Sequence, residues 1–265
     1  MIDNVKIDLA FHPPPSYWKK PLPNIELLGR EFSPLIDTFG YHKGYVARLE
    51  NLRLSVSEKY GQPRLVIANS LHKYYHGNNY SDFRLSQLRE SIARLESQLS
   101  LNLQDGHLTK MEYGLNIEAP ASRVYGDWQL FKNKPFAPMI TQRGVIYGQK
   151  CTLSYFSLKG YDKTFQVKEV DREKIEPALF RFEIAVKPRR YFQSFGELGI
   201  HTVADLGYRD KWRRLGEDLV AKYTAIEKEQ SWDLAQLSGE ELKYLAVMEH
   251  PAFRAAIRAR GGKTR

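Results

Sequence analysis

The sequence predicts an α+β fold, in which a mainly antiparallel sheet is covered by a long helix and followed by a C-terminal helical extension. Strand-like runs, in which every second residue is apolar, recur between residues 5 and 187. Beyond Pro188 the apolar residues are instead spaced by three and four, which is typical of helices. These patterns predict one α+β domain over residues 1–190 and a helical extension over residues 191–265.

Three of the strand-like runs carry an acid at the middle of their polar face. They are Val5–Phe11, Lys110–Glu118 and Leu179–Lys187. Because successive side chains of a strand point to opposite faces, Asp8, Glu112 and Glu183 lie opposite the apolar residues, and Asn116 shares the face of Glu112. If the three runs pair in one sheet, these side chains can hold Mg²⁺ or Mn²⁺, which prefer hard oxygen ligands. Each acid taken alone is more often a solvated surface charge.

The first half of the chain also predicts a hairpin and the long helix. The runs Asn51–Ser57 and Arg64–Ser70 flank a segment in which Gly61 and Pro63 favour a turn. The polar and aromatic segment Leu71–Tyr80 is predicted to be a loop. The helix follows from apolar residues spaced by three and four, which are Leu85, Leu88, Ile92, Leu95 and Leu99.

A candidate nucleophile lies between the second and third acidic runs. Thr152–Lys163 is predicted to be a strand that is broken or bulged at Gly160. Without a bulge, Tyr161 shares a face with two lysines, Lys159 and Lys163. Because a phenol is a weak nucleophile near its usual pKa of about 10, neighbouring cations would help by favouring the phenolate. Tyr155 is the second candidate on the same alternation.

Helices are predicted for the remainder of the chain. One apolar stripe consists of Trp212, Leu215, Leu219, Tyr223 and Ile226. Ser238 and Glu241 have the spacing of a capping box, which opens a further helix, and Pro251 starts the last one.

The composition favours a polyanionic partner. Lysines and arginines outnumber acids by 40 to 31, which gives a net charge of +9. The single Cys151 excludes an intramolecular disulfide, so we expect a reducing, cytoplasmic setting. No apolar run approaches the roughly 18 residues needed to cross a bilayer, so no membrane partner is expected. The oligomeric state is left open.

Two segments are candidates for nucleic-acid contacts. In the predicted loop, Lys73, Tyr74 and Tyr75 could stack on bases and pair with phosphates. His72 and His76 lie in the same loop, where contact with nucleic acid is favoured over a metal site. The last fifteen residues hold no acid and contribute Arg254, Arg258 and Arg260, which could grip DNA or simply be solvated.

Several segments, in this order, resemble the gene II family of phage and plasmid replication initiators, in the branch carried by Bacteroidetes-type mobile elements. The segments are MIDNVKIDLAF, LHKYYHGNNYSDF, LTKMEYGLNIE, GYDK, LFRFEIAVK and GIHTVADLGYRDKW. The resemblance covers residues 1 to about 228. It implies a rolling-circle initiator, which nicks one DNA strand through a tyrosine, stays attached to the 5′ phosphate and leaves a 3′ hydroxyl to prime synthesis.

The resemblance also implies roles for individual residues. Tyr161 and Lys163 match the tyrosine and lysine of the family's Tyr-Asp/Asn-Lys motif, and Glu112 and Glu183 match the acids of two of its strands. The chain departs from the family pattern in having Lys110 in place of a common arginine. It also has no His-hydrophobic-His pair, which many rolling-circle nucleases use to bind metal, and Gln166 stands near the place of an acid in relatives.

The predicted function is therefore nicking of single-stranded origin DNA, or of an origin hairpin, through Tyr161 with Mg²⁺ or Mn²⁺ on Asp8, Glu112 and Glu183 and with Asn116 assisting. Two alternatives remain. The first is a DNA-binding protein of a mobile element that has lost the chemistry, and the second is a nuclease that activates water with a metal. Only the first alternative predicts binding without cleavage, and only the second predicts cleavage without the tyrosine.

Overall fold

The computed structural model describes residues 1–11, 24–186, 198–229, 238–240 and 243. The chain divides into one compact unit over residues 1–228 and a second over residues 229–265. The first unit is an α+β structure built on a large antiparallel sheet, so the predicted α+β class with a mainly antiparallel sheet is confirmed. The helical extension over residues 191–265 stays a prediction. The predicted domain boundary at residues 190 and 191, the capping box that involves Glu241, and the helix at Pro251 lie outside the described residues.

The sheet has eleven strands in the order β10-β11-β12-β13-β7-β1-β6-β5-β4-β3-β2. On one side of its centre are β7 (His107–Glu118), β10 (Ala137–Ile140), β11 (Ile146–Thr152), β12 (Phe156–Asp162) and β13 (Leu179–Val186). On the other side are β1 (Ile2–Ala10), β2 (Ile25–Leu27), β3 (Arg30–Ile36), β4 (His42–Leu49), β5 (Leu52–Lys59) and β6 (Gln62–Ser70).

The two sides of the sheet repeat one connection pattern. A central strand, β1 or β7, is followed by a four-stranded meander that begins away from the centre and ends beside that central strand. The meander is β3-β4-β5-β6 after β1, and β10-β11-β12-β13 after β7. No repeat is visible in the sequence, because strand pairing and not residue identity carries the pattern.

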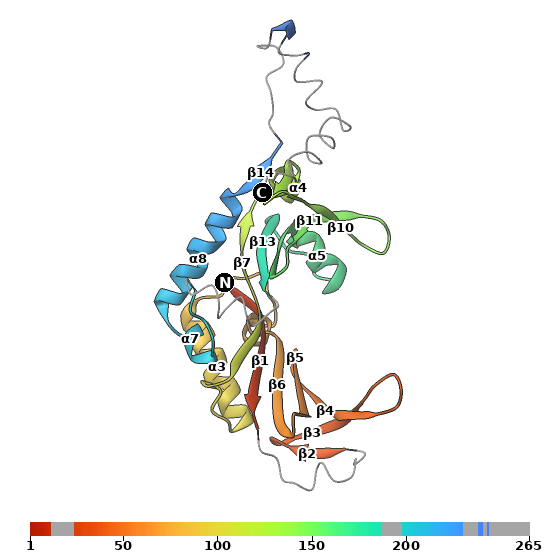
Figure 1. The fold of residues 1–265 in the computed structure, drawn as a ribbon, viewed down its shortest axis with the longest axis vertical. Coiled ribbons are helices and arrows are strands. Elements are labelled where there is room, and N and C mark those ends of the chain that lie inside the picture. The colour runs from red at the N-terminus through yellow and green to blue at the C-terminus, as the bar shows by residue number, and fades with distance from the viewer. Residues whose placement is uncertain (12–23, 187–197, 230–237, 241–242, 244–265) are drawn as a thin grey trace, which may run out of the picture. The chain divides into compact units, whose positions relative to one another are not determined.

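One face of the sheet is apolar and packs against helices. Figure 1 shows α3 (Leu85–Leu99), α7 (Val203–Leu206) and α8 (Arg209–Thr224) along this face, and α5 (Lys163–Val170) on the other side. The buried apolar residues of α3 occur at the predicted spacing, so this helix is confirmed. Tyr113, from the apolar face of β7, donates a hydrogen bond from its hydroxyl to Asp218 of α8. This contact places α8 against the face that is opposite to Glu112.

The predicted hairpin is confirmed as β5 and β6, joined by a turn in which Tyr60 and Gly61 both have positive φ. The predicted loop Leu71–Tyr80 is wrong in its first part, because residues Leu71–His76 form helix α2. Ser70 caps this helix by accepting a hydrogen bond from the backbone N–H of Lys73, a signal that the aromatic and polar composition obscured.

The predicted strand Thr152–Lys163 is also corrected. A turn separates β11 from β12, and the backbone N–H of Leu153 donates to the carbonyl of Phe156 across it. There is no break at Gly160, because β12 pairs continuously with both neighbours. A Cβ atom at Gly160 would lie 2.3 Å from the Trp128 ring, so glycine is required by close packing on the apolar face.

A second sheet has the strand order β14-β8-β9. Its strands are β8 (Trp128–Phe131), β9 (Lys134–Pro135) and β14 (Ile226–Lys228), and the short helix α4 (Ala121–Tyr125) precedes it. Ile226 belongs to β14, so the predicted apolar stripe of the helix ends earlier, at α8 Tyr223.

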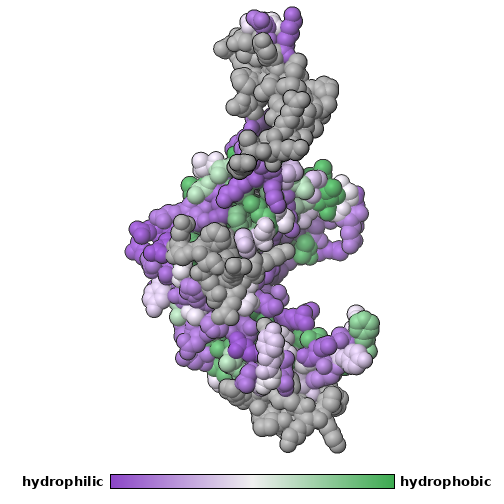
Figure 2. Space-filling view, viewed as in Figure 1, coloured by the Kyte–Doolittle hydropathy of each residue, from purple (hydrophilic) through white to green (hydrophobic). Residues whose placement is uncertain are grey.

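Polar side chains cover most of the surface seen in Figure 2, and hydrophobic residues gather at the ends of two hairpins. Ile36, Phe39 and Tyr41 are exposed at the β3–β4 hairpin, and Ile140, Val145 and Ile146 at the β10–β11 hairpin. Among the described residues, no helix is both long enough and apolar enough to cross a membrane.

Candidate active site

Strand register brings Tyr161, Glu112 and Glu183 into one cluster on the polar face of the sheet. In β12 and β13, Lys159 pairs with Glu183 and Tyr161 pairs with Arg181. In β13 and β7, Glu183 pairs with Gly114 and Ala185 with Glu112. Paired residues share a face, so the polar residues of three strands meet there.

Gly114 allows strands β7 and β13 to approach each other closely. A Cβ atom at this position would lie 2.2 Å from the carbonyl oxygen of Phe182 and 2.8 Å from the Cβ atom of Glu183. The glycine therefore accommodates the neighbouring strand directly beneath the Glu183 side chain.

Glu183 links the phenol to a lysine. The Tyr161 hydroxyl donates to Glu183 Oε2 at 3.0 Å, and Lys159 Nζ lies 2.6 Å from Glu183 Oε1. The same ammonium lies 3.5 Å from Glu112 Oε1, which Lys110 Nζ also approaches to 2.9 Å. The two glutamates thus share Lys159, which occupies the position between their carboxylates.

A β-bulge adds two further polar side chains. The register of β1 against β7 shifts between Ile2 and Val5, so Asp3 and Asn4 together face a single residue, Glu112. The Asn4 amide donates to Glu112 Oε2 at 2.6 Å. Asp3 is 3% exposed, although simple alternation from Val5 would place it on the apolar face.

Arg181 joins Asp3 to Glu183. Its guanidinium lies 3.1 Å from Asp3 Oδ2 and 3.8 Å from Glu183 Oε2, and the residue is 1% exposed. Asp3 also accepts hydrogen bonds from Ser70 and Asn79. The buried positive charge is therefore compensated by two buried carboxylates.

Lys163 lies at the first turn of α5 and not in a strand, but its ammonium still enters the cluster. Lys163 Nζ donates to Asn79 Oδ1 and to Gln166 Oε1, both at 2.8 Å. Burial and the nearby charge of Arg181 lower the pKa of Lys163 to about 7. Both hydrogen-bonding partners are neutral amides, so the charged form is not favoured by a salt bridge.

The phenol itself is held in its protonated form. Tyr161 is 4% exposed, and burial together with the negative charge of Glu183 raises its pKa well above 10. The expectation that nearby cations favour the phenolate is therefore wrong for this arrangement, because desolvation outweighs Arg181. Burial alone would raise the pKa of Glu183, but Lys159 and Arg181 hold it below its usual range.

The four predicted metal ligands are not brought together. Asp8 lies further along β1, opposite Val66 and His107, where it accepts a hydrogen bond from Arg64 Nε at 2.7 Å. The Asn116 amide donates to the carbonyl of Tyr80. Only Glu112 and Glu183 are close, and Lys159 lies between them. Among the described residues, no three His, Cys, Asp or Glu side chains form a group that could hold an ion, so the side chains as arranged do not fit a metal.

Of the nucleic-acid contacts predicted for the loop, the one at Tyr74 is wrong, and those at Lys73 and Tyr75, which are partly exposed, stay predictions. Tyr74 is 1% exposed and donates its hydroxyl hydrogen bond to Gln98, so it cannot stack on a base. The Tyr75 hydroxyl donates to Glu90, and Lys73 Nζ pairs with Asp171 at 2.6 Å. These side chains connect parts of the protein. Arg254, Arg258 and Arg260 lie outside the described residues.

The two histidines of this segment pack inside the protein. His72 is fully buried, its ring stacks on Phe83 at 4.7 Å, and its Nε2 is 3.2 Å from the Ser81 hydroxyl. Burial lowers the pKa of His72 to about 3, with a smaller contribution from Arg181. Its four-residue spacing from His76 therefore reflects packing of a helix.

Arg181, Lys159 and Asp3 are charged members of the cluster that the sequence analysis does not predict as site residues. Arg181 shares the face of Glu183 by simple alternation, so the sequence contained a signal for it. Alternation predicts Lys159 on the face of Tyr161, but its contacts with Glu112 and Glu183 depend on strand pairing, which alternation does not show. Asp3 could not be found by alternation, because the β-bulge alone turns it to this face.

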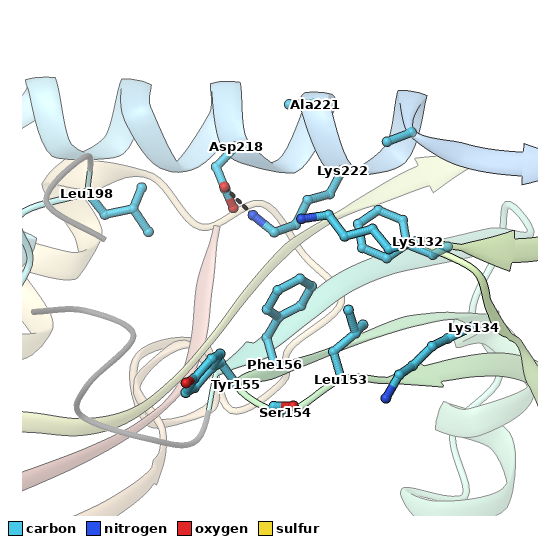
Figure 3. Close-up of a pocket in the computed structure, with 12 residues that line it drawn as sticks. Lys132, Lys134, Leu153, Ser154, Tyr155, Phe156, Leu198, Asp218, Ala221 and Lys222 are labelled. Atoms are coloured by element: carbon cyan, nitrogen blue, oxygen red, sulfur yellow. Dashed lines mark hydrogen bonds and ion pairs between the residues drawn. The ribbon is translucent and has the colours of Figure 1, made fainter. Parts of the chain in front are cut away.

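A separate cavity of about 430 Å³ lies next to β8, β12 and α8. Figure 3 shows the ammonium groups of Lys132 and Lys222 extending into it above Phe156, with Lys222 bonded to Asp218. Tyr155, the second candidate nucleophile, lines this cavity from the β11–β12 turn and is 40% exposed. Phe156, which also lines this cavity, belongs to the apolar side of β12, whereas Tyr161 belongs to its polar side. Tyr155 is therefore not part of the Tyr161 cluster.

No protein-family model matches the chain, and no curated protein is similar enough in sequence to match it. A solved structure of a rolling circle replication initiator protein from Geobacillus stearothermophilus is similar to the chain with a TM-score of 0.44 and 14% identity, over 93% of this chain and 94% of that one. A similarity of this size does not assign the chain to a family.

Proposed function

We propose that the protein is a rolling-circle replication initiator that nicks a single DNA strand through Tyr161. The observation that carries the proposal is the hydrogen bond from the Tyr161 hydroxyl to Glu183, in a cluster that also holds Arg181 and Lys159. A nucleophile, a proton acceptor and cations that can bind a phosphate are the parts that phosphodiester transfer to a tyrosine requires. The net charge of +9 supports a polyanionic substrate.

In the proposed reaction, the Tyr161 oxygen attacks the scissile phosphorus and its proton passes to Glu183. The bond from phosphorus to the 3′ oxygen breaks, and the 5′ phosphate stays on the tyrosine. Lys163, whose pKa is about 7, can give a proton to the leaving 3′ oxygen at neutral pH. Arg181 and Lys159 stabilise the charge that develops on the phosphoryl oxygens.

The mechanism requires the scissile phosphate to reach the Tyr161 hydroxyl, but this residue is only 4% exposed. Segment 77–81 is tied across the cluster by hydrogen bonds of its side chains and backbone. Asn79 bonds Lys163 and Asp3, and the Tyr80 carbonyl accepts from Asn116. We infer that this segment moves when DNA binds, which uncovers the phenol and removes part of the desolvation that raises its pKa.

The participation of Mg²⁺ or Mn²⁺ remains a separate proposal. Lys159 lies where a cation shared by Glu112 and Glu183 would bind, so no step above is assigned to a metal. Nicking in the presence of EDTA, compared with nicking in added Mg²⁺ or Mn²⁺, decides whether a divalent cation is needed.

The function is tested by incubating the full chain with a pool of single-stranded oligonucleotides of randomised sequence. We expect a covalent protein–DNA adduct that survives denaturing electrophoresis, and we expect its loss in Tyr161→Phe. Tyr155→Phe is the matched control, because Tyr155 is a more exposed phenol in another part of the unit, and this variant should form the adduct. An adduct that persists in Tyr161→Phe contradicts the assignment, and cleavage without an adduct indicates attack by water.

The second candidate is a DNA-binding protein without nicking activity. The burial of Tyr161 and the complete pairing of Glu183 with Lys159 and Arg181 favour it. It predicts salt-sensitive binding of the same oligonucleotides with neither adduct nor cleavage.

A further inference from the structure

A row of cations crosses the polar face of the sheet beside the candidate active site. The register pairs Lys110 with Lys6, Lys6 with Ala68, Ala68 with Arg53, and Arg53 with Arg48. These residues therefore form one transverse line over five strands, β7-β1-β6-β5-β4. With neighbouring strands about 4.8 Å apart, the line spans about 19 Å.

The row begins at the Tyr161 cluster. Lys110 bonds Glu112, and Glu112 also approaches Lys159, which bonds Glu183. The paired residues share one face of the sheet, so the row and the Tyr161 hydroxyl lie on the same side. At its far end the row reaches Arg48, beside Glu31, whose carboxylate accepts a hydrogen bond from Asn24.

Two of the cross-strand pairs bring like charges directly opposite each other. Lys6 faces Lys110, and Arg53 faces Arg48. Pairs of this kind destabilise a sheet, so the fold itself gives no reason for them. Among the described residues, Lys6, Arg48 and Arg53 form no ion pair within 4 Å, although Glu31 lies near Arg48, and all three are exposed.

The surface next to the row is formed mostly by small, partly exposed side chains. The adjacent line of paired residues begins at Asp8, whose charge is paired with Arg64, and continues through Val66, Ser55 and Val46. The row itself contains Ala68. All four of these small side chains are partly exposed. They leave room for a polymer backbone to lie against the sheet between the long basic side chains.

We propose that this row is a binding track for the phosphate backbone of single-stranded DNA that leads into the Tyr161 cluster. The proposal rests on the proposed function for its direction. A single file of four cations over five strands, in which β6 contributes Ala68, fits one sugar–phosphate backbone. The anionic backbone also compensates the like-charge pairs, which explains why the chain keeps them.

The test measures binding of a fluorescein-labelled oligothymidylate by fluorescence anisotropy over a series of NaCl concentrations. The double variant Lys6→Gln/Arg53→Gln removes two cations of the row. We expect the slope of log K against log salt to become shallower by about 0.7 for each cation removed, hence by about 1.4 in total. The matched control is Arg209→Gln/Arg213→Gln, which removes two exposed cations from α8, on the opposite face, and should bind like the wild type.

Loss of the fold is excluded by urea unfolding. Because the row variant relieves two like-charge pairs, its midpoint should be no lower than that of the wild type. An unchanged salt slope in the row variant, or the same change in the α8 control, would overturn the track. A duplex that binds as tightly as the single strand, with the same loss in the row variant, would overturn the assignment to single strands.

The outcome separates the track from the nicking activity, because oligothymidylate binding does not depend on cleavage. If binding follows the row but no Tyr161 adduct forms, the track stands and the proposed function fails. If an adduct forms but the row variant binds oligothymidylate like the wild type, the track alone fails.

Discussion

At the scale of single residues, the cluster around Tyr161 is a set of buried charges that compensate one another. Glu183 contacts Lys159, Arg181 and the Tyr161 hydroxyl, and every one of these side chains is mostly buried. In such a site, removal of one partner leaves an uncompensated charge away from water. Both the stability of the fold and the proposed chemistry therefore depend on the same residues.

Lys159→Met tests this dependence. The variant leaves Glu112 and Glu183 without the ammonium that they share, and we expect it to lower the free energy of unfolding by about 3 kcal/mol. In Lys159→Met/Glu183→Gln the loss should be smaller than the sum of the two single losses, because one of the uncompensated charges is gone. Urea unfolding of the four proteins measures the coupling. Additive losses would show that Lys159 and Glu183 do not stabilise each other.

Lys163→Met tests the buried amine. The pKa of Lys163 is lowered from 10.5 to about 7 in the folded protein, so the unfolded chain binds more protons between these values. The buried amine therefore destabilises the fold at and below pH 7, and this penalty decreases as the pH rises toward 10.5. We expect the wild type to gain about 2 kcal/mol relative to Lys163→Met between pH 7 and pH 9, as measured by urea unfolding at both pH values. Parallel pH profiles of the two proteins would contradict a buried amine with a lowered pKa.

At the scale of elements, the site depends on how closely β7 approaches β13. Gly114 lies beneath Glu183, and a Cβ atom there would overlap the carbonyl oxygen of Phe182. Because Gly114 has no side chain, β7, which holds Glu112, can lie close to β13, which holds Glu183.

Gly114→Ala should therefore separate the two strands and destabilise the protein by about 1–3 kcal/mol. Gly216→Ala is the control, since a Cβ atom at Gly216 in helix α8 meets no atom within 4 Å. Replacement of a helical glycine by alanine should stabilise the protein by about 0.5–1 kcal/mol. Unfolding midpoints that shift in the same direction for both variants would exclude close strand approach as the role of Gly114.

Alternation along the strands predicted much of this site and missed the rest for identifiable reasons. It placed Glu112 and Glu183 on one face correctly, because β7 and β13 pair without a register shift. It could not reveal that Asp8 lies further along β1, opposite Val66 and His107 and away from Glu112, since pairing partners are not visible in one sequence. It also could not find Asp3, because a β-bulge reverses the alternation at that point.

At the scale of the whole molecule, the predicted class was correct, but the helix α2 and the strands β3 and β4 were not predicted. In α2 the cap residue Ser70 ends a strand, so the start of the helix carried no separate signal. β4 contains Gly44, which has a positive φ and allows close approach to β5, and β3 contains a proline. Residues that interrupt the alternating pattern therefore hid two strands of the sheet.

The compact unit of residues 1–228 should fold without residues 229–265. Its apolar core is shared by the sheet and by α3, α7 and α8, all of which lie within the first 228 residues. A chain that ends at Lys228 should show one cooperative urea transition with the same midpoint as the full chain. A broad transition or a lower midpoint would show that the second unit stabilises the first.

The central claim is that Tyr161 forms a covalent bond to the 5′ phosphate of a nicked strand. Its most direct test uses randomised single-stranded oligonucleotides labelled at the 3′ end in one sample and at the 5′ end in another. The account predicts that only the 3′ label becomes attached to the protein, and that mass spectrometry of the digested adduct finds the nucleotide phosphate on the peptide containing Tyr161. Attachment of the 5′ label, or a phosphate on any other residue, would contradict the account.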